Sequence, residues 1–121
     1  MGMRILVVDD SGFMRKRIVT ELSAQGHIVA GEARGGVEAV ELYRALKPDL
    51  VTMDITMRDK DGITAAREIL QEDPNAKIVF LTILQDEKYK AEAQSLGAVG
   101  FVNKSDPLSL AEALERIRRA K

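Results

Sequence analysis

The sequence predicts an α/β fold in which a doubly wound, five-stranded parallel sheet carries helices on both faces. Segments rich in apolar and β-branched residues alternate five times with segments of helical periodicity along the 121 residues. The strand candidates are continuously apolar, which is typical of strands buried on both faces of a parallel sheet. No linker, internal repeat or low-complexity tract interrupts this order, so one domain over residues 1–121 is predicted.

Each predicted strand ends at a polar residue or a turn signal. The first is a run of Ile, Leu and Val that stops at Asp9 and Asp10, and the third is uncharged until Asp54. The fourth is strongly apolar, whereas the second is shorter and weaker. The predicted strands span residues 5–8, 28–30, 50–53, 78–82 and 99–102.

The helices are predicted from apolar residues that recur every three or four positions. Ser11 suits the N-cap of the first helix, which ends near Gly26, and Pro107 suits the first turn of the last helix. The other helices are predicted over residues 36–46, 62–72 and 86–96. The predicted inward-facing residues are Met14, Ile18, Leu22, Val37, Val40, Tyr43, Ile63, Ala66, Ile69, Leu110, Leu114 and Ile117.

The composition argues against several classes of function. A net charge of −1 supplies no basic surface field, so direct binding to nucleic acid is not expected. Cysteine is absent, which excludes disulfides and thiolate metal sites and suits a reducing cytosol, so a cytoplasmic location is expected. No apolar run approaches the roughly 20 residues that cross a bilayer, so membrane insertion is not expected.

Five polar residues follow or end the predicted strands: Asp9, Asp10, Asp54, Thr82 and Lys104. In an open parallel sheet the carboxyl ends of the strands meet at one edge, where ligands bind. Two carboxylates about 4 Å apart repel by roughly 4 kcal/mol at an effective dielectric near 20, so such a cluster requires a cation or a retained proton. Oxygen ligands without His or Cys suit Mg²⁺. The alternatives are that each aspartate is a turn-former or helix cap and that the lysine is a solvated loop residue.

The chain resembles the receiver domain of two-component response regulators, especially the stand-alone chemotaxis type. The resemblance rests on short segments spread over nearly the whole chain: residues 5–10, 48–54, Met57 with Asp61-Gly62, Thr82, Gly97-Ala98, and residues 101–104. It implies a flavodoxin-like strand order of 2-1-3-4-5. It also implies that Asp54 is the phosphoryl acceptor, that Thr82 and Lys104 contact the phosphoryl group, and that Mg²⁺ is held by Asp9, Asp10, Asp54 and the carbonyl of Thr56.

The resemblance implies a phosphorylation-dependent signalling switch rather than an enzyme acting on other substrates. The phosphoryl group would come from a histidine kinase or a histidine phosphotransfer protein. Thr82 and the aromatic residue Phe101 would then shift, changing the surface of the fourth helix, fifth strand and fifth helix toward an unknown output protein. The alternative for Phe101 is that it is simply a core aromatic on an apolar strand.

Three departures from the family pattern lie close to the predicted site. Arg58 replaces the usual proline after Met57, the bulky Ile83 follows Thr82 where a small residue is usual, and Ser105-Asp106 separate Lys104 from Pro107. Ile83 is expected to narrow access to Asp54 and slow exchange with small phosphodonors. These departures leave open an alternative function, a receiver-like interaction scaffold without phosphotransfer. A small phosphohydrolase is a third possibility. It is less favoured, because the chain has no room for a cap domain.

Overall fold

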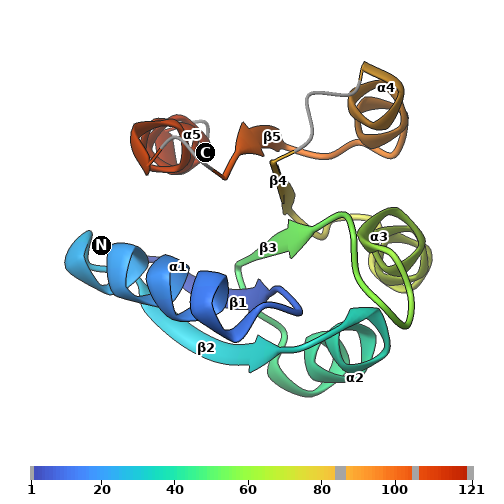
Figure 1. The fold of residues 1–121 in the computed structure, drawn as a ribbon, viewed down its shortest axis with the longest axis horizontal. Coiled ribbons are helices and arrows are strands. Elements are labelled where there is room, and N and C mark those ends of the chain that lie inside the picture. Colours follow the sequence, from blue (N-terminus) through green and yellow to red (C-terminus); the bar gives the residue numbers. More distant parts are fainter. Residues whose placement is uncertain (1, 84–86, 105–106, 120–121) are drawn as a thin grey trace.

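The structure, a computed structural model, describes residues 2–83, 87–104 and 107–119 of the chain, and the side chains of residues 107–109 are not described. Strands and helices alternate throughout (Figure 1). The strands are β1 Arg4–Val8, β2 Ile28–Ala33, β3 Leu50–Asp54, β4 Ile78–Thr82 and β5 Gly100–Asn103. The helices are α1 Gly12–Ala24, α2 Gly36–Leu46, α3 Gly62–Glu72, α4 Glu87–Ser95 and α5 Pro107–Arg119.

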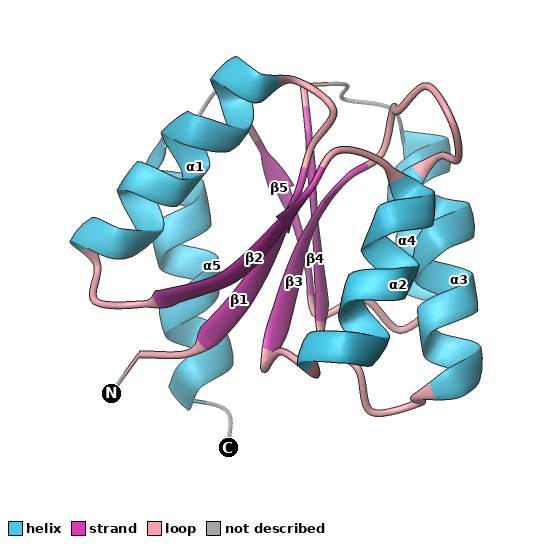
Figure 2. Ribbon diagram, turned by 90° about the horizontal axis from the view of Figure 1, so that it is seen from below, coloured by secondary structure: helices cyan, strands magenta, loops and turns pink. Residues whose placement is uncertain are grey.

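The strands form one parallel sheet in the order β2-β1-β3-β4-β5. Helices α1 and α5 cover one face, and α2, α3 and α4 cover the other (Figure 2). This is the doubly wound, flavodoxin-like architecture predicted from the sequence, and the prediction is confirmed. The order places β1 and β3 side by side, so the carboxyl ends of these two strands are neighbours.

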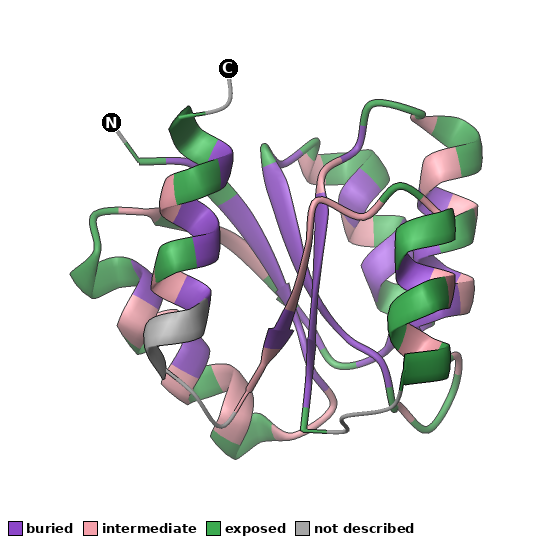
Figure 3. Cartoon of the chain, turned by 90° about the horizontal axis from the view of Figure 1, so that it is seen from above, coloured by how far each residue is buried: buried purple, intermediate pink, exposed green. Residues whose placement is uncertain are grey.

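Two apolar clusters hold the layers together, one on each face of the sheet. Strands β3 and β4 are buried along their whole length, while the outer surfaces of the helices are exposed (Figure 3). The α1/α5 cluster includes Ile18, Leu22 and Leu114, and the α2/α3/α4 cluster includes Tyr43, Ile69 and Phe80. Continuous burial on both sides explains why the strands of this chain read as unbroken apolar runs.

Most predicted inward-facing residues are buried, but Val37 is not. Its side chain is 46% exposed, whereas Val40 and Tyr43 on the same helix are buried. The buried residues of α2 are Gly36, Ala39, Val40 and Tyr43, which share one side of the helix. With 3.6 residues per turn, Val37 lies roughly 100° around the helix from the centre of that side. The prediction that Val37 faces the core is therefore wrong.

Strand β2 is longer than predicted, because it continues from Ala30 to Ala33. Its pairing register with β1 shifts between Ile5 and Leu6, which leaves Ala30 as the extra residue of a bulge. Gly31 permits close packing there, since a Cβ at this position would lie 2.6 Å from Leu46 Cδ1. An edge strand with a bulge and a glycine lacks the apolar pattern by which strands are predicted.

Smaller differences concern the ends of elements. The fifth strand begins at Gly100 rather than residue 99, and α4 begins at Glu87, whereas the predicted start at Asp86 lies outside the described residues. Within the described part of the chain, no helix has the length and apolar character needed to cross a membrane.

Candidate phosphoacceptor and metal site

The polar residues predicted to meet at one edge of the sheet do so. Asp9 directly follows β1, Asp54 is the last residue of β3, and Thr82 is the last residue of β4. Lys104 directly follows β5, and its backbone N–H donates to the carbonyl of Thr82 at 3.0 Å. Parallel pairing thus brings residues from distant parts of the sequence to a single carboxyl edge.

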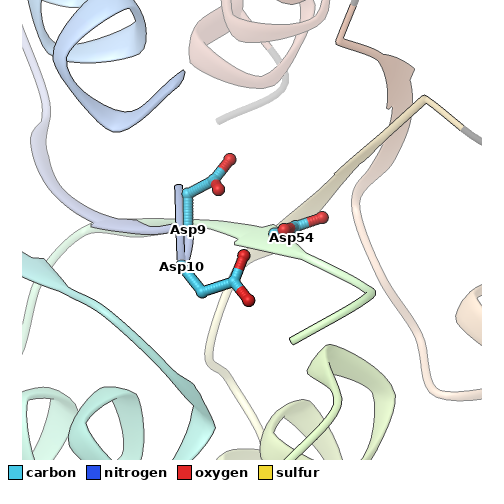
Figure 4. Close-up of side chains that lie close together, drawn as sticks. All are labelled: Asp9, Asp10 and Asp54. Atoms are coloured by element: carbon cyan, nitrogen blue, oxygen red, sulfur yellow. The ribbon is translucent and has the colours of Figure 1, made fainter. Parts of the chain in front are cut away.

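Three aspartates form a compact cluster at this edge. One carboxylate oxygen from each of Asp9, Asp10 and Asp54 lies within 4.8 Å of the others. Figure 4 shows Asp9 and Asp10 extending from the end of β1 toward Asp54 at the end of β3. Asp9 and Asp54 are buried, and Asp10 is the most exposed of the three. The cluster is therefore buried at Asp9 and Asp54 and open to solvent at Asp10.

Lys104 partly neutralises the cluster. Its Nζ lies 2.7 Å from Asp9 Oδ2 and 3.4 Å from Asp54 Oδ2, and its side chain is only 8% exposed. The lysine reaches both aspartates although Ser105 and Asp106, which lie outside the described residues, follow it in place of the usual proline. One ammonium group against three carboxylates leaves two negative charges at the site.

The backbone around Asp9 is fixed by residues at the start of α1. The N–H of Ser11 donates to Asp9 Oδ1 at 2.9 Å, while the Ser11 hydroxyl accepts from Met14 as the predicted N-cap. Arg15 Nη1 donates to the carbonyl of Asp9 at 2.7 Å, and Arg15 also pairs with Glu32 on β2. These contacts hold Asp9 in a defined position beside Asp54.

Burial and like charge perturb the carboxylate of Asp54. Removal from water, followed by the neighbouring charge of Asp9, raises the pKa of Asp54 to about 6, against the lowering effect of Lys104. At neutral pH the group is therefore mostly ionised, although it is close to its titration range. A buried, ionised carboxylate is a candidate nucleophile.

The donor set suits a small hard cation. Three carboxylates that share a site and are only partly neutralised by one lysine provide oxygen ligands and a residual charge that match Mg²⁺. Asp9, Asp10 and Asp54 are the side chains that would hold the ion.

The remaining predicted residues lie around this cluster. Thr56 is exposed in the loop after β3, and Arg58 is exposed in the same loop. Ile83 is 68% exposed directly after Thr82. Phe101 is half-buried and packs against the α2/α3/α4 cluster. The structure thus places Phe101 at the margin of the core rather than in its centre.

One polar residue of this region is not identified by the sequence pattern. Asp59, in the loop between β3 and α3, accepts hydrogen bonds from Gly36 and Val37 at the start of α2. The only signal in the sequence is indirect. The helical pattern of α2 begins at Gly36 and is preceded by Gly35 rather than by a Ser, Thr, Asp or Asn, so a side-chain cap would have to come from elsewhere.

Comparisons with known proteins identify the family of this chain. Residues 5–118 match the profile of the response regulator receiver domain. The chain is 45% identical over 120 residues to the chemotaxis protein CheY of Thermotoga maritima, covering 98% of this chain and 100% of that relative.

Two solved structures have the same fold. The CheX–CheY complex with BeF3 and Mg²⁺ from Borrelia burgdorferi superimposes with a TM-score of 0.90 at 31% identity, covering 94% of this chain and 87% of that chain. The response regulator domain of Thermotoga maritima CheB superimposes with a TM-score of 0.86 at 38% identity, covering 99% of this chain and 96% of that chain.

Proposed function

This chain belongs to the response regulator receiver family, whose members act in phosphorylation-dependent signalling, and on that premise we propose that Asp54 is its phosphoryl acceptor. The observation that carries the proposal is the cluster of Asp9, Asp10 and Asp54 with the Nζ of Lys104 between Asp9 and Asp54. The expected donors are a histidine kinase or a histidine phosphotransfer protein.

In the proposed reaction, an ionised carboxylate oxygen of Asp54 attacks the phosphorus of a phosphohistidine. A new P–O bond forms, the P–N bond breaks, and the imidazole nitrogen leaves with the bonding electrons. The raised pKa of Asp54, about 6, still leaves most of the group ionised at neutral pH. Transfer of this kind depends mainly on positioning and on neutralising charge on the transferred oxygens.

Lys104 and Thr82 are the proposed contacts to the transferred group. The lysine ammonium supplies a compact positive charge on a flexible stem, and it already lies against Asp9 and Asp54. The buried Thr82 carries a hydroxyl at the end of the neighbouring strand. Mg²⁺, held by Asp9, Asp10, Asp54 and the carbonyl of Thr56, would supply further positive charge to the phosphoryl oxygens.

The proposed output surface comprises α4, β5 and α5. Helix α4 is weakly anchored, because Ala93 is its only buried residue, whereas α3 buries five. Phe101 on β5 is half-buried, so a change in its packing is the proposed link between Thr82 and this surface. If the output surface has two conformations, phosphorylation must favour one of them by about 5.5 kcal/mol to move their ratio from 1:99 to 99:1.

We expect the output to be the binding of a protein in the cytoplasm rather than turnover of a separate substrate. The domain would promote only its own phosphorylation and dephosphorylation. The relative from Borrelia burgdorferi is in complex with CheX, which supports protein binding as the output of this family branch.

The proposal is tested by incubating the protein with Mg²⁺ and a small acyl-phosphate donor, followed by intact-mass measurement. We expect the mass of one phosphoryl group to be added to the wild type and none to Asp54→Asn. A phosphodonor protein should give the same result if Ile83 slows small donors. No mass gain with either donor would leave the interaction scaffold as the function.

A further inference from the structure

The loop of residues 55–61, which follows the proposed phosphoacceptor, is attached to a second helix. Asp59 Oδ1 accepts a hydrogen bond from the N–H of Gly36 at 3.0 Å, and Asp59 Oδ2 accepts one from Val37 at 3.2 Å. The N-cap residue of α2 is Gly35, which has no side chain to cap the helix. Asp59 therefore satisfies two of the free N–H groups at the start of α2 from more than 20 residues away.

The two glycines allow the loop to approach α2 this closely. A Cβ at Gly35 would lie 2.5 Å from Asp59 Oδ1, and a Cβ at Gly36 would lie 2.5 Å from the carbonyl oxygen of Lys60. Gly35 has an extended backbone that any residue adopts, so space and not backbone conformation requires a glycine there. The close contact therefore depends both on the Asp59 carboxylate of the loop and on the absence of side chains at Gly35 and Gly36.

The ends of the loop are held independently of α2. The N–H of Gly62 donates to the carbonyl of Ile55 at 2.7 Å, Asp61 caps α3, and Lys60 pairs with Glu68 on α3. The middle of the loop has Arg58, whose backbone φ is not restricted by a proline ring. Hydrogen bonds from backbone N–H groups, first that of Lys60, lower the pKa of Asp59, so it is ionised when it binds α2.

We propose that Asp59 is a positioning residue for the metal and phosphoryl site, acting by attaching the middle of the 55–61 loop to α2. This inference rests on the proposed function, because the loop carries Thr56, whose carbonyl is the proposed backbone ligand of Mg²⁺. Thr56 lies three residues before Asp59 and two after Asp54, so the attachment restricts the segment between them. Residues that orient metal ligands without touching the ion typically change its affinity by about 10- to 100-fold when replaced.

The test compares Mg²⁺ affinity, measured by calorimetry without a phosphodonor, in wild type and in Asp59→Ala. We expect binding to weaken about tenfold in Asp59→Ala. Asp59→Asn, whose amide oxygen still accepts one of the two hydrogen bonds, should weaken it less and remains informative if the alanine variant folds poorly. Amide hydrogen exchange at Gly36 and Val37 should accelerate in the same order.

Two further variants separate positioning from stability. Glu38→Ala removes a carboxylate at the start of α2 that accepts from Arg34 N at 2.8 Å rather than from the groups bound by Asp59, and it should leave Mg²⁺ affinity unchanged. Gly36→Ala improves the helix propensity of α2 but displaces the loop at Lys60, and should weaken Mg²⁺ binding.

The outcomes are distinct for the two proposals. Unchanged Mg²⁺ affinity in Asp59→Ala, with faster exchange at Gly36 and Val37, would reduce Asp59 to a helix cap and overturn the inference while the proposed function stands. Failure of the wild type to bind Mg²⁺ would instead overturn the metal site itself, and the inference with it.

Discussion

Charged residues lie at both ends of the strands, along the amino edge and the carboxyl edge of the sheet. The two edges accommodate these charges in opposite ways. At the amino edge, the backbone N–H of Arg4 donates to Asp49 Oδ2 at 2.8 Å, and the N–H of Asp49 donates to the carbonyl of Arg4 at 2.8 Å. The Arg4 guanidinium donates to the carbonyls of Leu46 and Lys47 at 3.1 Å each, at the end of α2. These groups are exposed, and each is matched by a partner of complementary charge or polarity.

The carboxyl edge instead places like charges together and removes them from water. Asp9 and Asp54 are buried, Asp10 adds a third carboxylate, and Lys104 neutralises only part of the charge. The amino edge therefore stabilises the fold, whereas the carboxyl edge retains electrostatic strain that suits a cation and a phosphoryl group. Local conflicts of this kind are typical of functional sites.

The largest expected effect is that of Lys104→Met, measured by urea unfolding in chelator at pH 7.5. This substitution leaves Asp9 and Asp54 buried without their counter-ion, so the free energy of unfolding should fall by about 4 kcal/mol. The matched change at the amino edge, Arg4→Met, should cost about 1 kcal/mol, because its partners are exposed carbonyls. Equal losses at the two edges would contradict the comparison.

The second effect is a pH-dependent increase in the free energy of unfolding in the variant Asp54→Asn. The pKa of Asp54 is raised from 3.8 to about 6 in the folded protein, so the folded state binds this proton more tightly than the unfolded state does. Ionisation of Asp54 therefore lowers stability as the pH rises from about 4 to about 6, by roughly 3 kcal/mol for a shift of this size.

Asp54→Asn should accordingly be more stable than wild type above pH 6 in chelator, with the difference disappearing near pH 4. Unfolding at a series of pH values measures this difference. Asp49→Asn at the amino edge serves as the control and should give no gain at any pH, because Asp49 is exposed and bonded to Arg4. A gain in Asp54→Asn that does not vary with pH would refute the electrostatic explanation.

The third effect concerns Mg²⁺ itself. At a Mg²⁺ concentration tenfold above its Kd, binding to the folded state alone should stabilise wild type by about 1.4 kcal/mol and raise its melting temperature. Asp10→Asn should remove most of this rise and should stabilise the metal-free protein by relieving repulsion within the cluster. Thermal melts with Mg²⁺ and with chelator test both statements, and an undiminished Mg²⁺ response in Asp10→Asn would argue against the assigned ligands.

The smallest expected effect concerns a buried polar group that lies inside the sheet, next to the carboxyl edge. Thr52, two residues before Asp54 on β3, is fully buried, and its Oγ1 has no hydrogen-bond partner in the described part of the chain. Thr52→Val should therefore stabilise the protein by about 1 kcal/mol. Thr20→Val on the exposed surface of α1, where the hydroxyl donates to the carbonyl of Lys16 at 2.9 Å, should give no gain. Denaturant midpoints of both variants measure the difference.

The carboxyl-edge cluster was predictable because it follows from chain order. Asp9, Asp54 and Lys104 each end or directly follow a strand, and parallel pairing brings such positions to one edge. The contact of Asp59 with α2 was not predictable, since it joins residues 23 positions apart through a carboxylate that reads as an ordinary loop residue. The exposure of Val37 was missed because a spacing of three residues fits either margin of a helical stripe, and only the structure shows that the buried side of α2 is centred on Gly36, Val40 and Tyr43.

The sequence alone determined the order of strands and helices, the burial of the sheet on both faces, and the residue types at the strand ends, because these depend on local periodicity and on where apolar runs stop. Only the tertiary structure decided the distances among the carboxylates, the reach of Lys104 and the raised pKa of Asp54. Those quantities depend on burial and on separations of a few ångströms between strands that are remote in the chain, and no local pattern encodes them.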